Sequence, residues 1–297
     1  MKHTYIVLLI LVLVISVFLL YRRSIIEGFV DTFDLYDLPS VKQSPNPSEY
    51  TAIMIEPRKH GAMEYVLKNF TDNLDERWNF IIFHGNLNEQ FVKDIVDKKL
   101  QKHKHRITFS NLGVDNLTVA QYSELFYNAA LYDNIPTEMF LVFQTDSMIL
   151  AKNKDNIYKF MNFDYVGAPW NDKIRGFSIT NGTATTKNIV GNGGLSLRRK
   201  SKMLEVLEHK DKCLDTENKQ PYGKFIAEDQ CFNGSYAQDV NLRVPTLENA
   251  KFFGVEELYS NQAFGTHKPW LWKHVNNYSD LIKEFPEIEV LEKLQKD

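Results

Sequence analysis

The sequence predicts an α/β fold built on a mainly parallel sheet with helices on its faces. From residue 50 to about residue 143, short apolar runs typical of strands alternate with segments whose apolar residues recur at helical spacing. Such alternation favours right-handed crossovers between parallel strands. The chain has 297 residues, of which 43% are hydrophobic and 13% aromatic, and this suits one large domain rather than two.

The elements of this α/β region follow one another in a regular order. The predicted strands are residues 51–55, 78–83, 106–109 and 139–143. The predicted helical stretches between them are residues 63–70, 91–96 and 119–130. Open sheets of this kind bind ligands beyond the carboxyl ends of their strands. We therefore expect functional residues directly after the strands.

The first 23 residues are predicted to form a membrane anchor. An uncharged run from Thr4 to Tyr21 can cross roughly 27 Å of hydrocarbon at about 1.5 Å per residue. The alternative is a cleaved signal peptide, but Arg22 and Arg23 follow the run without a small-x-small cleavage site. Positive charges flank the run on both sides, so the sequence leaves the orientation in the membrane open.

The rest of the chain divides into three predicted parts. Residues 24–49 contain a Ser-Pro-Asn-Pro-Ser run and are predicted to be a stalk, residues 50–275 the globular domain, and residues 276–297 a helical tail. Within the domain, residues 171–188 are rich in Thr, Asn and Gly. We expect this polar loop to be mobile and able to close over a substrate.

Charge, cysteines and sequons limit the possible partners and compartments. The net charge is -3 with both signs interspersed, which argues against nucleic acid as the main partner. Cys213 and Cys231 are the only cysteines, and they form either one disulfide or two buried thiols. The chain has Asn-x-Ser/Thr sequons at five positions, which would suit a lumenal domain: Asn69, Asn116, Asn181, Asn233 and Asn277.

Asp146 is the first candidate metal ligand. It lies in Gln144-Thr145-Asp146-Ser147, three residues after the predicted strand 139–143. Carboxylate oxygens are the ligands that hard divalent cations prefer. The alternative is that Asp146 caps the turn that follows the strand.

Two further motifs contain acids and glycines. In Ala227-Glu228-Asp229-Gln230, adjacent carboxylates on a helix point in different directions, so at most one is expected to do acid–base chemistry. The alternative is a favourable acidic pair at a helix start. In Gly191-Asn192-Gly193-Gly194, glycines let the backbone approach a sugar or phosphate closely, or simply form a turn.

Basic residues could neutralise an anionic ligand at two places. Arg198 and Arg199 follow the glycine motif and could contact phosphate, but on a strand they face opposite ways and one should be solvated. In Gly265-Thr266-His267-Lys268-Pro269-Trp270, His267 can bind a metal and Lys268 a diphosphate, with Trp270 packing beneath them.

These motifs, preceded by Glu56-Pro57-Arg58, resemble in order and spacing the glycosyltransferases of the GT-A fold. The resemblance extends from Thr51 to Trp270 and is closer to a family of largely uncharacterised glycosyltransferase-like domains of large DNA viruses, fungi and bacteria. Gly265-x-x-Lys268-Pro-Trp270 is also similar to the closing motif of the family 8 glycosyltransferases. There a metal-binding His lies three residues before the Gly, where this chain has Gln262, so His267 is the candidate substitute.

The resemblance implies a GT-A-like, Rossmann-like fold and a transferase that uses a nucleotide-sugar donor, Mn²⁺ or Mg²⁺, and an inverting mechanism. The acceptor would be a glycan, protein or lipid. The Asn- and Lys-rich composition and the Ile26-Glu27-Gly28-Phe29 run after the anchor favour a large DNA virus membrane protein, in a host endomembrane or virion membrane. The resemblance implies catalytic roles for Asp229 as the base and Glu228 as a residue that orients the acceptor. It implies donor-binding roles for Glu56, Arg58, Gln144, Asp146, Gly193, Gly194 and Lys268, and metal ligation by Asp146 and His267.

The departures from the family pattern keep other functions open. Related enzymes usually have Asp-x-Asp where this chain has the single Asp146. A catalytically silent GT-A-like protein that binds carbohydrate or nucleotide is therefore the main alternative. A metal-dependent hydrolase is less favoured, because the histidines are scattered and no His-x-x-x-His set occurs.

Overall fold

The computed structural model describes residues 48–171, 190–210, 227–232 and 240–296. The chain divides into two units, Met1–Asp37 and Leu38–Asp297, and all described residues belong to the second. The predicted anchor, the stalk up to residue 47, Cys213 and residues 172–188 of the predicted loop lie outside the described residues. Among the helices that are described, none has the length and apolarity needed to span a membrane.

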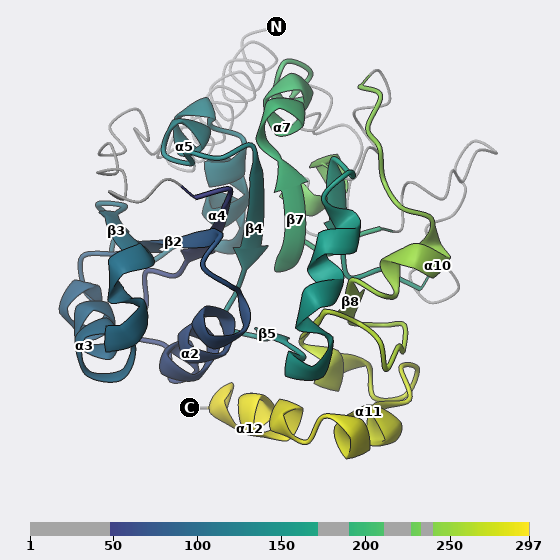
Figure 1. Ribbon diagram of the computed structural model, residues 1–297. Coiled ribbons are helices and arrows are strands. Elements are labelled where there is room, and N and C mark those ends of the chain that lie inside the picture. The colour runs from purple at the N-terminus through teal and green to yellow at the C-terminus, as the bar shows by residue number, and fades with distance from the viewer. Residues whose placement is uncertain (1–47, 172–189, 211–226, 233–239, 297) are drawn as a thin grey trace, which may run out of the picture. The chain divides into compact units, whose positions relative to one another are not determined.

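The main sheet has six strands in the order β3-β2-β1-β4-β7-β6 (Figure 1). The strands are β1 Tyr50–Ile55, β2 Trp78–His84, β3 Ile107–Asn111, β4 Met139–Phe143, β6 Tyr165–Gly167 and β7 Leu195–Arg199. β3, β2, β1 and β4 pair in parallel, whereas β7 is antiparallel to both neighbours. The sheet is thus mixed, and the prediction of a mainly parallel sheet holds only for its first four strands.

The helices cover both faces of this sheet. α2 (Met63–Asn73) and α3 (Glu89–Lys99) follow β1 and β2, and right-handed crossovers in one direction place both helices on the same face. The return from β3 to β4 carries α4 (Val119–Phe126) and α5 (Ala129–Asp133) to the other face. The single helical stretch predicted at 119–130 is two helices, because the Asn128 side chain accepts a hydrogen bond from Ala130 N and starts α5.

A second, three-stranded sheet lies next to the carboxyl end of β4. Its order is β5-β9-β8, with β5 Ser147–Ile149, β8 Gly254–Val255 and β9 Gly265–His267. β5 and β9 are antiparallel and pair Ser147 with His267. The pairing brings the residue before β5, Asp146, next to the end of β9. The other described elements are η2 Gln101–Arg106, η3 Ala151–Phe160, α7 Lys200–Leu207, α9 Glu228–Gln230, α10 Leu247–Ala250 and η6 Pro269–Trp272.

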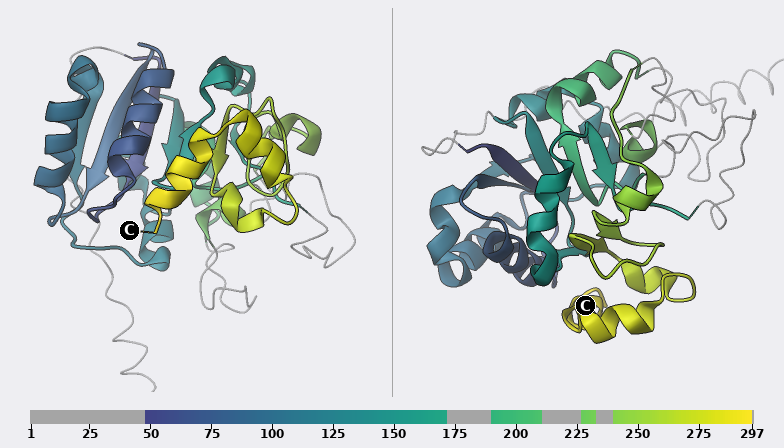
Figure 2. Two further views of the ribbon diagram at one scale, coloured as in Figure 1. Left: turned by 90° about the horizontal axis from the view of Figure 1, so that it is seen from below. Right: turned by 45° about the vertical axis from the view of Figure 1, so that its right-hand side comes forward.

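The C-terminal helices α11 (Tyr278–Glu284) and α12 (Glu287–Leu294), yellow in Figures 1 and 2, pack against earlier parts of the domain. Tyr65 on α2 donates a hydrogen bond to Glu287 O at 3.0 Å. Gln295 Nε2 donates to Thr145 O at 2.8 Å. The end of the chain therefore contacts the loop that carries Asp146.

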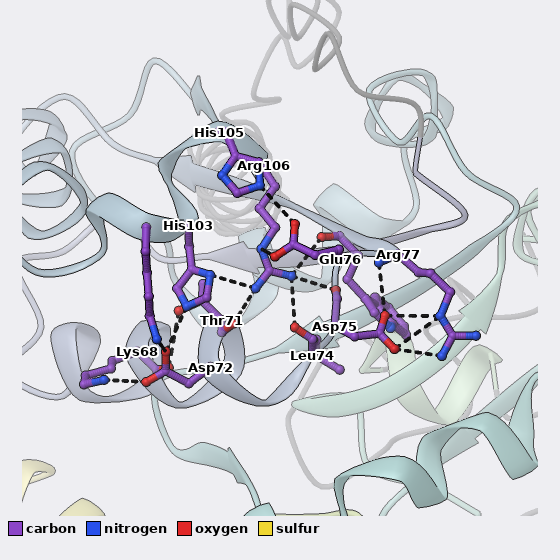
Figure 3. Close-up of polar contacts among 12 residues, drawn as sticks. Lys68, Thr71, Asp72, Leu74, Asp75, Glu76, Arg77, His103, His105 and Arg106 are labelled. Atoms are coloured by element: carbon purple, nitrogen blue, oxygen red, sulfur yellow. Dashed lines mark hydrogen bonds and ion pairs between the residues drawn. The ribbon is translucent and has the colours of Figure 1, made fainter.

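Arg106 closes the turn between α2 and β2 (Figure 3). The sequence predicted it as a strand residue, but it ends η2 and is buried, with 2% exposure. Its guanidinium donates to the carbonyl oxygens of Thr71, Leu74 and Asp75, and to His103 Nδ1. α2 has no basic residue in its own last turn, so Arg106 supplies donors that its C-terminal carbonyl groups need.

Candidate functional site

A cavity of about 450 Å³ opens at the carboxyl ends of β1 and β4. From β1 the chain order runs along the sheet one way to β2 and β3, while β4 lies on its other side, so the cavity is at a topological switch point. All ten site residues predicted from the sequence line it: Glu56, Arg58, Gln144, Asp146, Gly193, Gly194, Glu228, Asp229, His267 and Lys268.

Asp146 and His267 form one side of this cavity. Lys268 N donates to Asp146 O at 2.9 Å, and His267 Nε2 lies 3.2 Å from Asp146 Oδ1. His267 is fully buried, and neither its ring nitrogens nor Asp146 Oδ1 has a hydrogen-bond partner in the described part of the chain. Lys268 Nζ lies 3.8 Å from Asp146 Oδ2. A cation site requires ligand atoms of this kind, which lie close together, are buried and are not already used in hydrogen bonds.

The Asp146–His267 pair fits a divalent cation that retains open positions. Two ligands at about 2.1 Å from one ion, at near-octahedral angles, lie roughly 3 Å apart. Imidazole and carboxylate together suit Mn²⁺, and the carboxylate also suits Mg²⁺. Within the described ranges no group of three or more His, Cys, Asp or Glu residues could hold a metal ion. Water would supply the remaining ligands in the absence of nucleotide, and diphosphate oxygens would replace part of this water when a donor binds.

Local charges keep Asp146 ionised. Burial alone would raise the pKa of its carboxyl, but the neighbouring His267 and Lys268 outweigh burial and hold that pKa well below the usual range. The carboxylate is therefore available as an anionic ligand at neutral pH.

Glu228 is held in a buried ion pair. Its Oε1 accepts from Arg198 Nη2 and its Oε2 from Ser123 Oγ, both at 3.2 Å. Arg198 is itself fully buried, and its guanidinium lies over the rings of Phe126 and Phe232. These contacts fix the position of Glu228 at the start of α9.

Asp229 has a different environment, although it is the next residue. Its Oδ2 accepts one hydrogen bond from Gly193 N at 3.1 Å. Burial and then the charge of Glu228 raise the pKa of Asp229 to about 7, although the Gly193 N–H opposes the shift. A carboxyl that titrates near neutral pH is suited to accept a proton during catalysis.

The glycine turn before β7 allows both groups to come close. A Cβ at Gly193 would collide with Glu228 Oε1, and one at Gly194 would collide with His267 Nε2 and Gln144 Oε1. Gly194 O also accepts from Gln144 N at 2.9 Å, which ties the turn to the end of β4. This turn therefore lies between two sides of the cavity: the metal side, formed by Asp146 and His267, and the acid side, formed by Glu228 and Asp229.

The loop after β1 contributes Glu56 and Arg58. The Nε and Nη2 atoms of Arg58 each donate to one Glu56 carboxylate oxygen at 2.8 Å. Asn88 fixes this loop, since its Nδ2 lies 2.8 Å from both Glu56 O and Arg58 O. Nothing in the sequence around Asn88 indicates this role, because the contact spans about thirty residues of chain.

The structure corrects the prediction for Arg198 and Arg199. Neither residue is among those that line the cavity. Arg198 is buried against Glu228 rather than solvated, and Arg199 Nε donates to the buried Asp164 at 2.8 Å. Both guanidinium groups neutralise carboxylates of the interior, which would be costly to bury unpaired.

Several residues that line the cavity were not predicted as site residues. They are Asn116, Thr118, Tyr122, Ser123, Asn192 and Trp170. Thr118 and Gln121 form a capping box at the start of α4. The Thr-x-x-Gln spacing is visible in the sequence and could have marked this helix start next to the strand ends.

The chain is thus an α/β protein with a cavity at a topological switch point. It belongs to a protein family of unknown function, DUF5672, which matches residues 106–277, more than half of the chain. The matched range includes Asp146, Glu228, Asp229 and His267, but not Glu56 or Arg58. No curated protein matches the sequence.

Solved structures with a similar fold include three glycosyltransferases. A mannosyltransferase of Pyrobaculum calidifontis, in complex with GDP-Man and Mn²⁺, is 12% identical with a TM-score of 0.43, covering 77% of this chain and 61% of its own. TarS of S. aureus, with UDP-GlcNAc, is 15% identical with a TM-score of 0.40, covering 65% and 54%. GlyE of Streptococcus pneumoniae is 10% identical with a TM-score of 0.38, covering 64% and 43%.

This chain therefore spans less than two thirds of those three proteins. All three TM-scores are below 0.5, so these similarities carry no functional argument, and the function has to be inferred from the cavity.

Proposed function

We propose that this protein is a membrane-anchored glycosyltransferase that moves a sugar from a nucleotide-sugar donor to a glycan, protein or lipid acceptor, with inversion and with Mn²⁺ or Mg²⁺. The observation that carries the proposal is the arrangement around the Gly193–Gly194 turn. The Asp146–His267 pair, with Lys268 nearby, lies on one side of this turn, and the Asp229 carboxyl with a pKa of about 7 lies on the other.

The leaving group of such a reaction is a nucleoside diphosphate. Asp146 and His267 would hold a divalent cation, which would supply positive charge for this leaving group. Lys268 adds an ammonium group next to Asp146, where it can hydrogen-bond a diphosphate oxygen. Glu56 and Arg58 are the residues proposed to contact the nucleotide base and ribose, and Asn88 holds their loop.

Asp229 is the proposed general base. Its carboxylate takes the proton of the acceptor hydroxyl as that oxygen attacks the anomeric carbon, while the bond from this carbon to the diphosphate oxygen breaks. One displacement from the opposite face inverts the anomeric centre. Glu228 is fixed by Arg198 and Ser123, so its proposed part is to orient the acceptor and to keep the pKa of Asp229 high.

The proposal is tested by thermal unfolding of the detergent-solubilised full chain with UDP-, GDP- and CMP-sugars, with and without Mn²⁺. A donor at about 100 times its dissociation constant should stabilise the fold by roughly 2.7 kcal/mol. Asp146→Ala should lose the metal-dependent part, whereas Asp280→Ala, on the exposed side of α11, should keep it. The absence of any shift with every donor would contradict the proposal.

A catalytically silent binding protein is the second candidate. The observation in its favour is the single carboxylate at the metal side of the cavity, where the described residues offer only the Asp146–His267 pair. Nucleotide-sugar binding without hydrolysis or transfer, measured with the same preparation, would support this function instead.

We also propose that the domain faces an oxidising, lumenal side of its membrane. Cys231 is disulfide-bonded, and Cys213 is the one other cysteine in the sequence. Disulfides persist in the lumen of the secretory pathway and are rare in the cytosol. The sequon at Asn277 is exposed at the start of α11, where a glycan could be attached.

A further inference from the structure

We propose that Glu256, which no motif in the sequence indicated, is a positioning residue for His267. In this role Glu256 holds the ring so that Nε2 faces the cation position beside Asp146. The inference rests on the proposed metal site of the glycosyltransferase, and it concerns how that site is kept in shape.

The second sheet places Glu256 beside His267. β8 and β9 are parallel with Val255 opposite Thr266, so the residues that follow, Glu256 and His267, lie next to each other at the strand ends. Thr266 Oγ1 donates a hydrogen bond to Val255 O at 2.8 Å, which stabilises this strand register.

The turn beyond these two strands is fixed in the same way. Asn276 is fully buried, and its Nδ2 donates to Glu256 O at 2.7 Å and to Pro269 O at 2.8 Å. The backbone on both sides of the Glu256–His267 contact is therefore held in place.

The ring of His267 lies between two carboxylates. Glu256 Oε1 is 3.6 Å from Nδ1, and Asp146 Oδ1 is 3.2 Å from Nε2. Glu256 is 1% exposed and His267 0%, so bulk water does not screen the interaction between the two side chains. Each nitrogen of the ring therefore faces a different carboxylate.

This arrangement has a specific consequence for metal binding. A neutral imidazole that ligates through Nε2 carries its proton on Nδ1, the nitrogen that faces Glu256. At 3.6 Å the two atoms are just beyond hydrogen-bond distance. A small closing movement when the cation binds would form a hydrogen bond from Nδ1–H to Glu256, which would fix both the tautomer and the ring orientation. Carboxylates that hold a metal-binding histidine in this way typically contribute 10–100-fold to metal affinity.

The neighbouring Glu257 provides a matched control. It is also fully buried, and its Oε2 accepts a hydrogen bond from Asn171 N at 2.7 Å. Of these two adjacent buried glutamates, Glu256 lies beside the His267 ring, and Glu257 accepts from a backbone N–H.

The test measures Mn²⁺ binding alone, by electron paramagnetic resonance of free Mn²⁺, with the detergent-solubilised full chain and no nucleotide. Glu256→Gln should weaken binding about 10–100-fold, Asp146→Asn should remove it, and Glu257→Gln should leave it unchanged. Thermal unfolding without metal checks that each variant is folded. If Glu256→Gln does not fold, Glu256→Asp replaces it, and it should bind Mn²⁺ more weakly than the wild type.

Two results would overturn the inference, and they differ in what they say about the proposed function. Wild-type-like Mn²⁺ affinity in a folded Glu256 variant, with binding lost in Asp146→Asn, rejects the role of Glu256 and leaves the transferase proposal intact. A wild-type protein that binds no Mn²⁺ rejects the metal site and the inference together, while nucleotide-sugar turnover could still be measured.

Discussion

At the scale of single residues, Asp229 makes the sharpest prediction. Burial and the charge of Glu228 raise its pKa to about 7, so the fraction of protein with a competent base grows as pH rises through neutrality. We expect kcat/KM of transfer to rise tenfold per pH unit below about pH 7 and to level off above it. Steady-state kinetics from pH 5 to pH 9 measure this.

Two variants at the same pair complete that experiment. Asp229→Asn should lower the rate by about 10²–10⁴-fold above pH 7, where the wild-type carboxylate is ionised, and by less at lower pH. Glu228→Gln removes a charge that raises the pKa of Asp229, and should move the midpoint of the profile to lower pH. A profile without a midpoint near neutrality in the wild type would mean that Asp229 is not the base.

The same carboxyl should also make stability depend on pH. The folded-state pKa of Asp229 is raised above the ordinary value of 3.8, so the folded state retains a proton that the unfolded state releases between about pH 4 and pH 7. The wild type therefore loses stability across this range, and Asp229→Asn does not have this loss. We expect Asp229→Asn to gain a few kcal/mol relative to wild type between pH 4 and pH 8, measured by urea unfolding.

Gly194 gives a prediction about close approach. A Cβ there would collide with His267 Nε2 and Gln144 Oε1. We expect Gly194→Ala to weaken Mn²⁺ binding at least tenfold, because the imidazole must move away from Asp146. Gly113→Ala is the control, since Gly113 has open space around it but a φ of +72°. It should cost about 1 kcal/mol of stability and leave Mn²⁺ binding unchanged.

The sequence was most informative about the site residues that directly follow a strand. Asp146 and Glu56 could be predicted as cavity residues because each comes soon after an apolar run. Arg198 could not be interpreted in that way, because its partner Glu228 is distant in sequence and the pairing depends on the fold. Glu256 was missed for the same reason, since only the β8–β9 register brings it to His267.

At the scale of elements, β1, β2 and β4 could be predicted because each is a mainly apolar run buried on both faces of the sheet, whereas β3 is a shorter, half-buried strand that Ile107 and Phe109 indicate. β7 could be recognised as a segment after the glycine motif, but its direction could not. Strand direction depends on which end of the sheet the chain re-enters, and the connection into β7 has no apolar periodicity that would indicate it.

The turn between α2 and β2 allows an element-scale prediction about stability. Arg106→Lys keeps one positive charge but loses the planar donors that reach Thr71, Leu74 and Asp75. Buried carbonyl groups left without donors should lower the free energy of unfolding by about 2–4 kcal/mol. Urea unfolding would measure the change.

Arg77 in the same region supplies the control for Arg106 (Figure 3). It pairs with Asp75 at 2.7 Å on the exposed surface, so Arg77→Lys should cost no more than about 1 kcal/mol. Equal effects of the two substitutions would mean that Arg106 does not cap α2.

At the scale of the whole molecule, the cavity is assembled from segments that lie far apart in the sequence. Glu56 comes from the loop after β1, Asp229 from α9 and His267 from the end of β9. The order of motifs was sufficient to predict that these residues share a site. Their distances, the pairing of Glu228 with Arg198 and the elevated pKa of Asp229 depend on packing that a sequence does not show.

Three sequons lie within the described residues, and they make a prediction about the membrane orientation specific. The Asn69 amide is used inside the fold, since it donates to Ile149 O at 3.0 Å and accepts from Ile149 N at 2.7 Å. Asn116 lines the cavity, where a glycan would block access. Asn277 and Ser279 are exposed at the start of α11.

We therefore expect the full chain, translated with microsomes, to carry a glycan at Asn277 if the domain is lumenal. Asn277→Gln and Ser279→Ala should each remove the same single, endoglycosidase-sensitive step in mass, because both destroy one sequon. Disulfide bonding of Cys231 should persist in the microsomal product without added oxidant. A membrane-inserted chain with no glycan and with reduced cysteines would place the cavity on the cytosolic side, where the acceptor would have to be sought instead.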